Sequence, residues 1–221
     1  MSAQPPATEA RLARKQQQRS LVTQQKLLAA AIEAFSANGF KGTSTRDIAE
    51  RAGVHHPLIT YHFKNKDRLW RAAADGIFRE FNVSLAKAMA EVPEVDPKAR
   101  AEAFIRTYVR YAHSQPALHK FILQESSRPS QRLDWLIESH LKPVYDLVVE
   151  PLSRLQELGV APAGKTALLY NMIRVSAGGL LALSLEIRGT TNIDLQGEEE
   201  LNELADMIVR VFLPGEMPQH D

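Results

Sequence analysis

Apolar residues recur along most of the chain at intervals of three and four residues, the spacing that places them on one face of an α-helix. The pattern is clear by Leu28, Ile32 and Phe35, and it continues in successive segments almost to the C-terminus. We find no convincing strand pattern and no internal repeat. The sequence therefore predicts an all-α fold.

Local signals near the N-terminus predict short helices separated by a tight turn. Gly39 suits the left-handed position that ends a helix. Ser44 and Asp47 have the spacing of a capping box that begins the next helix, with Asp replacing the usual Glu or Gln. Gly53 permits a tight turn, and Pro57 suits the first position of a third helix. Together these signals predict a helix–turn–helix.

The remainder predicts a series of longer helices. Asn65 can cap the first of them, and Pro93 and Pro97 end it. Pro143 and Pro151 should kink a later helix. Further helices are expected over residues 98–113, 116–122, 131–158, 163–188 and 198–213. We expect a disordered basic arm over residues 1–20, a helix–turn–helix domain over 21–68 and a helical body over 69–215.

The expected arm is rich in Gln, Ala and Pro and carries the basic residues Arg11, Arg14, Lys15 and Arg19. Such a composition is typical of a solvated, disordered tail. An arm that fastens onto phosphates or the minor groove once DNA is bound is the alternative. The two interpretations are compatible, because a disordered arm can become ordered on binding.

Charge is distributed unevenly along the chain. The segment up to Trp70 holds eleven Lys and Arg and five Asp and Glu, a net charge of +6, whereas the remainder has a net charge of −5. A helix–turn–helix pattern alone also occurs in proteins that never bind DNA. The coincidence of positive charge with this motif favours a DNA-binding role, because bound DNA requires its phosphates to be neutralised.

The same segment resembles the N-terminal domain of the TetR family of bacterial transcriptional regulators. The resemblance extends from about Gln24 to Ala74 and is carried by these residues: Phe35, Asn38-Gly39-Phe40, Thr43-Ser44-Thr45-Arg46-Asp47-Ile48-Ala49, Ala52-Gly53-Val54 and Tyr61-His62-Phe63-Lys64-Asn65-Lys66-Asp67-Arg68-Leu69. It implies a dimer of helical subunits, each with a DNA-binding head and a ligand-binding body.

The resemblance also implies which residues contact DNA. They are Thr45, Arg46, Val54, His55, His56, Pro57, Thr60, Tyr61, His62 and Lys66. Thr45, Tyr61 and Lys66 are expected to anchor phosphates. His55, His56 and Thr60 are better placed to contact base edges. Val54 and the His-His-Pro run depart from the Ser/Gly-rich turn common in the family, so its base preferences do not transfer.

The helical body is expected to contain a ligand pocket. Candidate lining residues are aromatic side chains and polar groups among apolar neighbours: Tyr108, Trp135, Tyr145, Asn171 and Arg174. A buried Arg requires a carboxylate, a carbonyl or an anionic ligand as its partner. An ion pair of Arg174 with Glu125, Glu138 or a neighbouring subunit is the alternative to ligand contact, and an ordinary aromatic core is the alternative for the other side chains.

Other chemistries find little support. Gly159–Thr166 fits the phosphate-binding pattern G-x-x-x-x-G-K-[ST], but the preceding residues have helical periodicity instead of forming the required strand. The chain has no Cys, and its seven His lack partners at metal-ligand spacing, so we expect no metal site and no cofactor. No signal peptide, membrane span or enzyme signature is evident, which favours a cytoplasmic protein that is not an enzyme.

We therefore expect a homodimeric repressor that binds a near-palindromic double-stranded operator and leaves it when a small-molecule effector binds. A nucleotide-binding protein is one alternative, and it would require the phosphate-binding match to be genuine. An architectural DNA binder is another, and it would show neither sequence preference nor effector response. The sequence alone does not distinguish repression from activation.

Overall fold

The computed structural model describes residues 7–217, which form helices and no strand. The all-α prediction is confirmed. Internal contacts divide the chain into two units between Gly76 and Ile77, within the long helix α4 (Lys66–Ala90). This division falls later than the boundary expected after residue 68, because the first turns of α4 group with the preceding helices.

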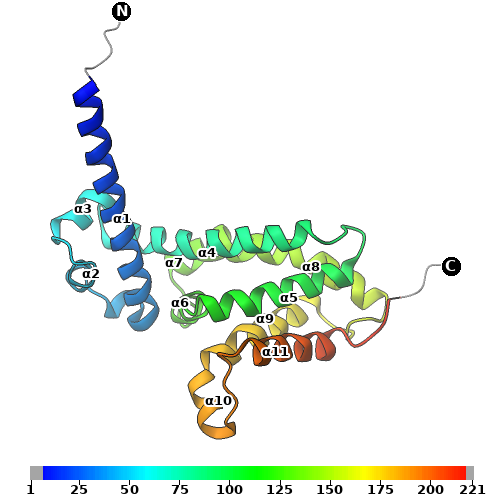
Figure 1. Ribbon diagram of the computed structural model, residues 1–221. Helices are drawn as coiled ribbons and strands as arrows, with labels where there is room; N and C mark the ends of the chain where they lie inside the picture. Colours follow the sequence, from blue (N-terminus) through cyan, green and yellow to red (C-terminus); the bar gives the residue numbers. More distant parts are fainter. Residues whose placement is uncertain (1–6, 218–221) are drawn as a thin grey trace, which may run out of the picture. The chain divides into compact units, whose positions relative to one another are not determined.

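The first unit contains α1 (Ala7–Gly42), α2 (Thr45–Arg51) and α3 (Pro57–Phe63), followed by the start of α4 (Figure 1). Gly39 has φ 65° inside the span of α1 and interrupts its regular geometry. This left-handed conformation favours glycine, which has no Cβ. The ring of Phe40 then stacks on that of Phe35, with 6.0 Å between ring centroids. The helix therefore deviates where the sequence predicted its end.

The N-terminal segment differs from the disordered arm expected over residues 1–20. From Ala7 onward the chain is helical and belongs to α1. The segment from Ala7 to Ser20 contains no Gly or Pro and is rich in Ala, Arg and Gln, all good helix formers. Residues 1–6 of the expected arm lie outside the described part of the chain.

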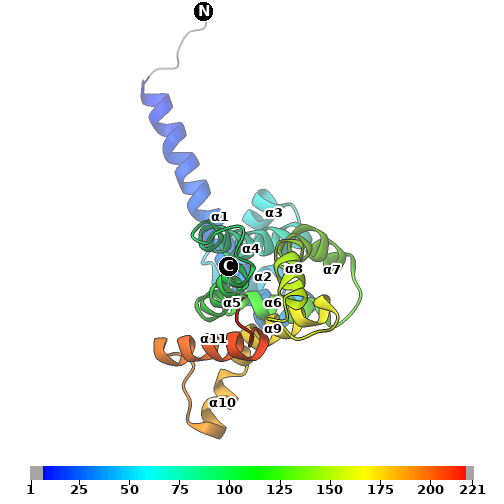
Figure 2. The same cartoon turned by 90° about the vertical axis from the view of Figure 1, so that its right-hand side faces the viewer.

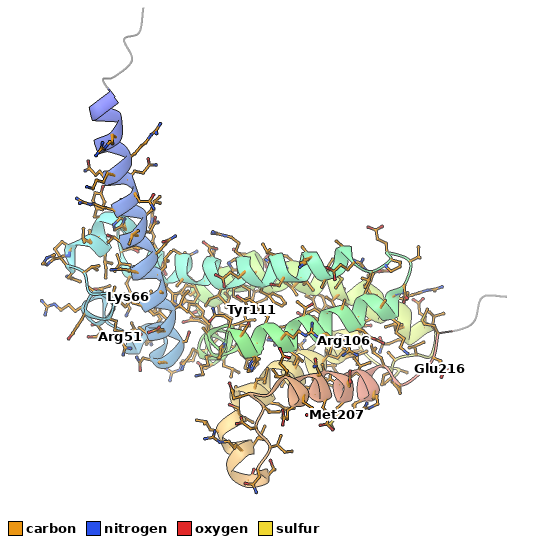
Figure 3. The ribbon with its side chains drawn as sticks, viewed as in Figure 1. Arg51, Lys66, Arg106, Tyr111, Met207 and Glu216 are labelled. Atoms are coloured by element: carbon orange, nitrogen blue, oxygen red, sulfur yellow. The ribbon has the colours of Figure 1, made fainter. Side chains whose placement is uncertain are left out.

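The second unit is organised around α5 (Pro97–Ser114), which packs against α8 (Lys142–Glu157), α9 (Thr166–Ala182) and α11 (Glu198–Phe212). The Tyr111 hydroxyl donates to the Ile77 carbonyl at 2.7 Å and joins α5 to α4. Arg106 and Asp206 form an ion pair at 2.6 Å between α5 and α11. Figure 3 shows Tyr111 and Arg106 on α5 facing these neighbouring helices.

The helix expected over residues 131–158 is interrupted. It comprises α7 (Gln131–Leu136), a π-helical segment over Ile137–Leu141 and then α8. Pro143 lies in the first turn of α8, where its missing N–H removes one helical hydrogen bond. Pro151 lies inside α8 without ending it.

The prediction of a single helix over residues 163–188 is wrong. The structure has α9 and then α10 (Ser184–Thr191), bent by 71° relative to each other. Leu183 leaves the helical conformation, with φ −97° and ψ 12°. Figure 2 shows α10 projecting beyond α9 and α11. Apolar residues continue through the bend, so their periodicity did not reveal it.

No single helix among the described residues is both long and apolar enough to cross a membrane. Only α9 and α10 meet that criterion when taken together, and they are sharply bent with respect to each other.

Candidate functional sites

The helix–turn–helix is built by the cap and turn signals present in the sequence. The Ser44 hydroxyl accepts a hydrogen bond from the Asp47 backbone N–H at 3.0 Å, and the Asp47 carboxylate accepts from the Ser44 N–H at 3.4 Å. Gly53 has φ 64° in the turn, and Pro57 is the first residue of α3. These features confirm the predicted capping box and turn.

The capping box provides a test of local stability. Ser44→Ala should destabilise the first unit by about 1 kcal/mol, because the Asp47 N–H at the start of α2 loses its acceptor. Thermal or denaturant unfolding would measure this loss. Ser44→Asn, which retains a capping oxygen, should be close to wild type, and equal stability of all three proteins would contradict a capping role.

The interior face of α3 fixes the orientation of its exposed face. Ile59 and Phe63 are buried. On the other side of the segment, His55, His56, Pro57, Thr60 and Tyr61 are exposed, and Tyr61 retains 75% of its accessible surface. Arg46 is also exposed, whereas Thr45, Val54 and His62 are half-buried. The predicted DNA-contact residues therefore lie mainly on the solvent-facing side of the motif.

Two of these residues are directly joined. The Thr45 hydroxyl and His56 Nε2 lie 2.9 Å apart, within hydrogen-bond distance, and connect the start of α2 to the start of α3. His56 makes no side-chain capping bond to α3. The hydrogen bond to Thr45 orients the imidazole and leaves its Nδ1 edge to contact another group.

Lys66 is held by a different contact. Its ammonium group lies over the Phe40 ring, 4.4 Å from the ring centroid, in a cation–π arrangement. The Phe40 ring therefore contacts both Phe35 and Lys66. Sequence reasoning left out Lys64, an exposed cation with φ 66° between α3 and α4. Figure 3 shows Lys66, together with Arg51 at the end of α2.

The second unit contains a buried aromatic cluster. Tyr108 is buried, and its ring contacts Phe81 and Phe104, with centroid distances of 5.5 and 5.7 Å. Tyr170 stacks on Phe104 at 5.9 Å and meets the half-buried Tyr145 edge-on at 5.1 Å. The expected pocket residues Tyr108 and Tyr145 are therefore connected through this cluster.

Arg174 supplies positive charge at the edge of the cluster. Burial raises the pKa of the Tyr108 hydroxyl, and the Arg174 guanidinium offsets part of that rise. Burial likewise raises the pKa of Tyr170 to about 12, again with an opposing effect of Arg174. The Tyr108 hydroxyl has no hydrogen-bond partner of suitable geometry among the described residues.

The other expected pocket residues lie elsewhere. Asn171 is exposed on α9, where its amide donates to the Ala167 carbonyl at 2.8 Å and accepts from Arg174 at 3.2 Å. It therefore faces solvent and not the apolar interior that its neighbours suggested. Trp135 is half-buried and meets His140 edge-on, with 5.1 Å between ring centroids.

Glu125 and His119 are buried ionisable groups that were not among the expected site residues. Glu125 pairs with Arg132 at 3.2 Å, which differs from the suggested Glu125–Arg174 ion pair. His119 is also buried, on the same helix as Glu125, α6 (Ala117–Ser126). Their positions follow the apolar face of α6, which also buries Leu118 and Ile122, so helical periodicity was the signal that could have identified them.

The phosphate-binding sequence match forms no such site. Residues 159–166 join α8 to α9, with no strand before them. Gly159 has φ 71° directly after α8, and Thr166 begins α9. The segment is thus a connection between helices, as the periodicity before it indicated. No group of three or more potential metal ligands occurs among the side chains that the structure describes.

Comparison with known proteins identifies the DNA-binding region. Residues 27–73 match the family described as "Bacterial regulatory proteins, tetR family". They span the C-terminal part of α1, all of α2 and α3 and the first turns of α4.

This match places the N-terminal domain of the chain in the TetR family of bacterial transcriptional regulators. The chain is 25% identical to the HTH-type transcriptional regulator RutR of Escherichia coli K12 over 194 residues. The aligned region covers 87% of this chain and 90% of that protein. As a TetR-family member it is a DNA-binding transcriptional regulator, and this family consists of regulators and not enzymes.

Solved structures extend the similarity in fold across both units of this TetR-family chain. A linker mutant of HlyIIR aligns with a TM-score of 0.70 and 17% identity, covering 88% of this chain and 98% of that one. AibR, solved with isovaleryl coenzyme A and operator DNA, aligns with a TM-score of 0.64 and 18% identity, covering 87% and 98%. These likenesses concern the fold.

Proposed function

We propose that this TetR-family protein is a cytoplasmic, homodimeric repressor that leaves its operator when a small molecule binds in the helical body. The observation that carries the proposal is the solvent-facing polar surface of α2 and α3 within a positively charged segment. AibR, which has a similar fold, binds both operator DNA and a small molecule. This precedent supports the combination of the two kinds of partner.

The DNA complex would follow two-fold geometry. Two copies of α3 would enter successive major grooves about 34–36 Å apart. His55, His56 and Thr60 would face base edges, and Thr45, Tyr61 and Lys66 would face phosphates. Selection from random duplexes should enrich a near-palindromic motif. Binding without an enriched motif would instead support an architectural DNA-binding role.

Phosphate anchors and base contacts should differ experimentally. Lys66→Ala and Tyr61→Phe should weaken binding to all duplexes alike. Lys66→Ala loses one phosphate contact, so the slope of the logarithm of the binding constant against the logarithm of the salt concentration should become shallower by about 0.9. His56→Ala should change the preference at one base pair by about 1–3 kcal/mol. Competition assays across single-base operator variants measure both. A uniform loss in His56→Ala would contradict its role in base recognition.

The Thr45–His56 hydrogen bond gives a sharper test of the same surface. Thr45→Val preserves side-chain shape but removes the hydroxyl, so His56 should lose its fixed orientation and part of its base preference. Thr45→Ser retains the hydroxyl and should keep the wild-type preference. A double-mutant cycle between Thr45→Val and His56→Ala should give a coupling of about 0.5–3 kcal/mol. Strict additivity would show that the hydrogen bond does not support recognition.

A second copy would cover an exposed apolar surface of the body. On α9, Leu168, Met172 and Val175 project from one face and are exposed. On α11, Met207 and Val211 are exposed on the outer side, and Figure 3 shows Met207 pointing away from α5. Exposed apolar stripes on two neighbouring helices are suited to a two-fold four-helix interface.

The aromatic cluster near Arg174 supports an effector-binding role for the body. Tyr108, Tyr145 and Arg174 remain the proposed lining residues there, with Trp135 beside His140 on another part of the unit. Asn171 instead orients Arg174 from the surface of α9. Arg174→Ala should leave operator affinity near normal and blunt effector release. Linkage also requires operator DNA to weaken effector binding by the same factor by which the effector weakens DNA binding.

A further inference from the structure

A separate cavity lies within the second unit, between α5, α6, α9 and α10. Its volume is about 160 Å³. Three side chains with basic nitrogens line it, namely His113, His119 and Lys120, and none of the described lining residues is acidic. Apolar side chains, including Leu181 and Leu185, supply other parts of its wall. The cavity thus combines an apolar wall with two imidazoles and one cationic side chain, Lys120.

His119 is the distinctive group in this wall. Only 4% of its surface is accessible, and its Nδ1 atom has no hydrogen-bond partner among the described residues. A buried polar atom left without a partner lowers stability, so such an atom calls for an explanation in the native structure. The imidazole also forms part of the cavity wall, so a ligand bound there would contact the ring.

The packing around His119 depends on a glycine in α9. A Cβ atom added at Gly178 would lie 2.6 Å from Nδ1 of His119 and 2.9 Å from Cε1 of Tyr108. Both rings therefore approach the α9 backbone more closely than any other residue type at position 178 would permit. This contact holds the imidazole at the junction of the cavity and the aromatic cluster.

The electrostatic surroundings of His119 favour a negatively charged ligand. Burial lowers the pKa of His119, and the Arg174 guanidinium on α9 lowers it further. The imidazole is therefore predominantly neutral at pH 7. The nearby groups on the other helices are the phenol of Tyr108 and the imidazole of His113 on α5, with Lys120 on α6 itself. An anion would be attracted to the Lys120 ammonium and would stabilise a proton on His119.

We propose that the effector is a small carboxylic acid whose carboxylate binds His119 and Lys120 in this cavity while its apolar part packs against Leu181 and Leu185. The identification of this acid as the effector rests on the proposed regulatory function. The cavity volume is comparable to the engineered cavity of about 150 Å³ that accommodates benzene. Acids from about the size of butyrate to that of benzoate are therefore suitable ligands.

The location also provides a route to regulation. Gly178 and Ala182 form part of the cavity wall on α9, the helix that also carries exposed residues of the proposed dimer interface. A ligand that shifts α9 would therefore change the packing between subunits. Such a change would alter the spacing of the two DNA-binding heads.

Matched acids and amides test the proposed ligand chemistry. The full-length protein would be titrated with butyrate and benzoate, and with butyramide and benzamide as neutral controls of nearly the same shape, by calorimetry. At least one acid should bind about tenfold or more tightly than its amide, as expected for a charge-assisted hydrogen bond. Equal binding of acid and amide, or binding of neither acid, would overturn the proposal.

Protonation supplies a second readout at the proposed site. Because a bound carboxylate raises the pKa of His119, acid affinity should rise as pH falls from 7.5 toward the free imidazole pKa, which lies below the ordinary value of 6.5. Side-chain nitrogen NMR should show the His119 resonances shifting with benzoate. Unchanged His119 resonances during benzoate binding would place the ligand elsewhere and overturn the assignment.

Two substitutions remove the titratable or charged group at His119 or Lys120 while they are expected to preserve the fold. His119→Asn retains a polar nitrogen near the Nδ1 position but removes the titratable group, so it should flatten the pH dependence of acid binding. The exposed residue Lys120 can be changed to Gln without disturbing the core, and Lys120→Gln should weaken acid binding about fivefold to tenfold. Wild-type affinity and pH dependence in both variants would contradict the proposed carboxylate contacts.

Operator binding distinguishes this inference from the broader regulatory proposal. Weaker operator binding when benzoate or butyrate occupies the cavity would support both. Release by an unrelated neutral molecule, with no shift at His119, would support effector regulation and overturn the carboxylic-acid assignment. Acid binding at His119 that leaves operator affinity unchanged would overturn the assignment of the acid as effector while confirming the binding site.

Discussion

Met172→Lys should convert the protein from a dimer to a monomer and weaken operator binding by at least about 100-fold. Met172 is 56% exposed on α9, beside Leu168 and Val175, so a lysine there should leave the fold of the subunit intact. In the proposed dimer the charge would be buried against an apolar surface without a partner. A dimer holds two DNA-binding heads together, which typically increases the affinity for DNA by a factor of about 10²–10⁴. Loss of the dimer removes this increase.

Leu123→Lys is the matched control for this substitution. Leu123 is 54% exposed and apolar, but it lies on α6 outside the stripe on α9 and α11. It should remain dimeric and bind the operator normally. Light scattering at micromolar concentration would determine the mass of each variant. A dimer in Met172→Lys, or a monomer in the unmodified protein, would contradict the proposed interface.

The elements of the first unit could be predicted because their determinants are local. Ser44 and Asp47 lie three residues apart and cap the same helix, and Gly53 and Pro57 set the turn and the next helix start by their own backbone properties. The bend at Leu183 has no comparable signal. It depends on how α9 and α10 pack, and the apolar pattern is continuous across it.

The candidate sites were predictable to different extents for the same reason. The exposed face of α3 follows from which of its residues are apolar, so the positions of His56 and Tyr61 could be inferred. The Thr45–His56 bond required the relative placement of two helices. The surroundings of His119 required the relative placement of three helices, because α6 carries the imidazole while α5 and α9 enclose it. Asn171 shows the converse error, because apolar sequence neighbours on α9 did not imply an apolar environment.

Phe63→Ala should abolish operator binding while leaving the dimer intact. Phe63 is buried at the end of α3, and removing a buried phenylalanine side chain typically costs about 3–5 kcal/mol. That loss is a large fraction of the total stability of a small domain, roughly 5–15 kcal/mol. The residues that hold the exposed face of α3 in place would therefore become disordered. The body contains its own buried core and should retain its helices.

Tyr61→Ala separates this structural effect from the loss of a DNA contact. Tyr61 lies on the same helix two residues earlier, but its ring is largely exposed, so its removal should weaken DNA binding without unfolding the unit. Hydrogen exchange should show rapid exchange in α2 and α3 of Phe63→Ala and near-native protection in Tyr61→Ala. Because the chain divides into two units near Gly76, protection of α5 and α9 should persist in both variants. Loss of protection throughout the chain in Phe63→Ala would show instead that the two units unfold together, and that the buried face of α3 stabilises the whole protein as well as its DNA-binding surface.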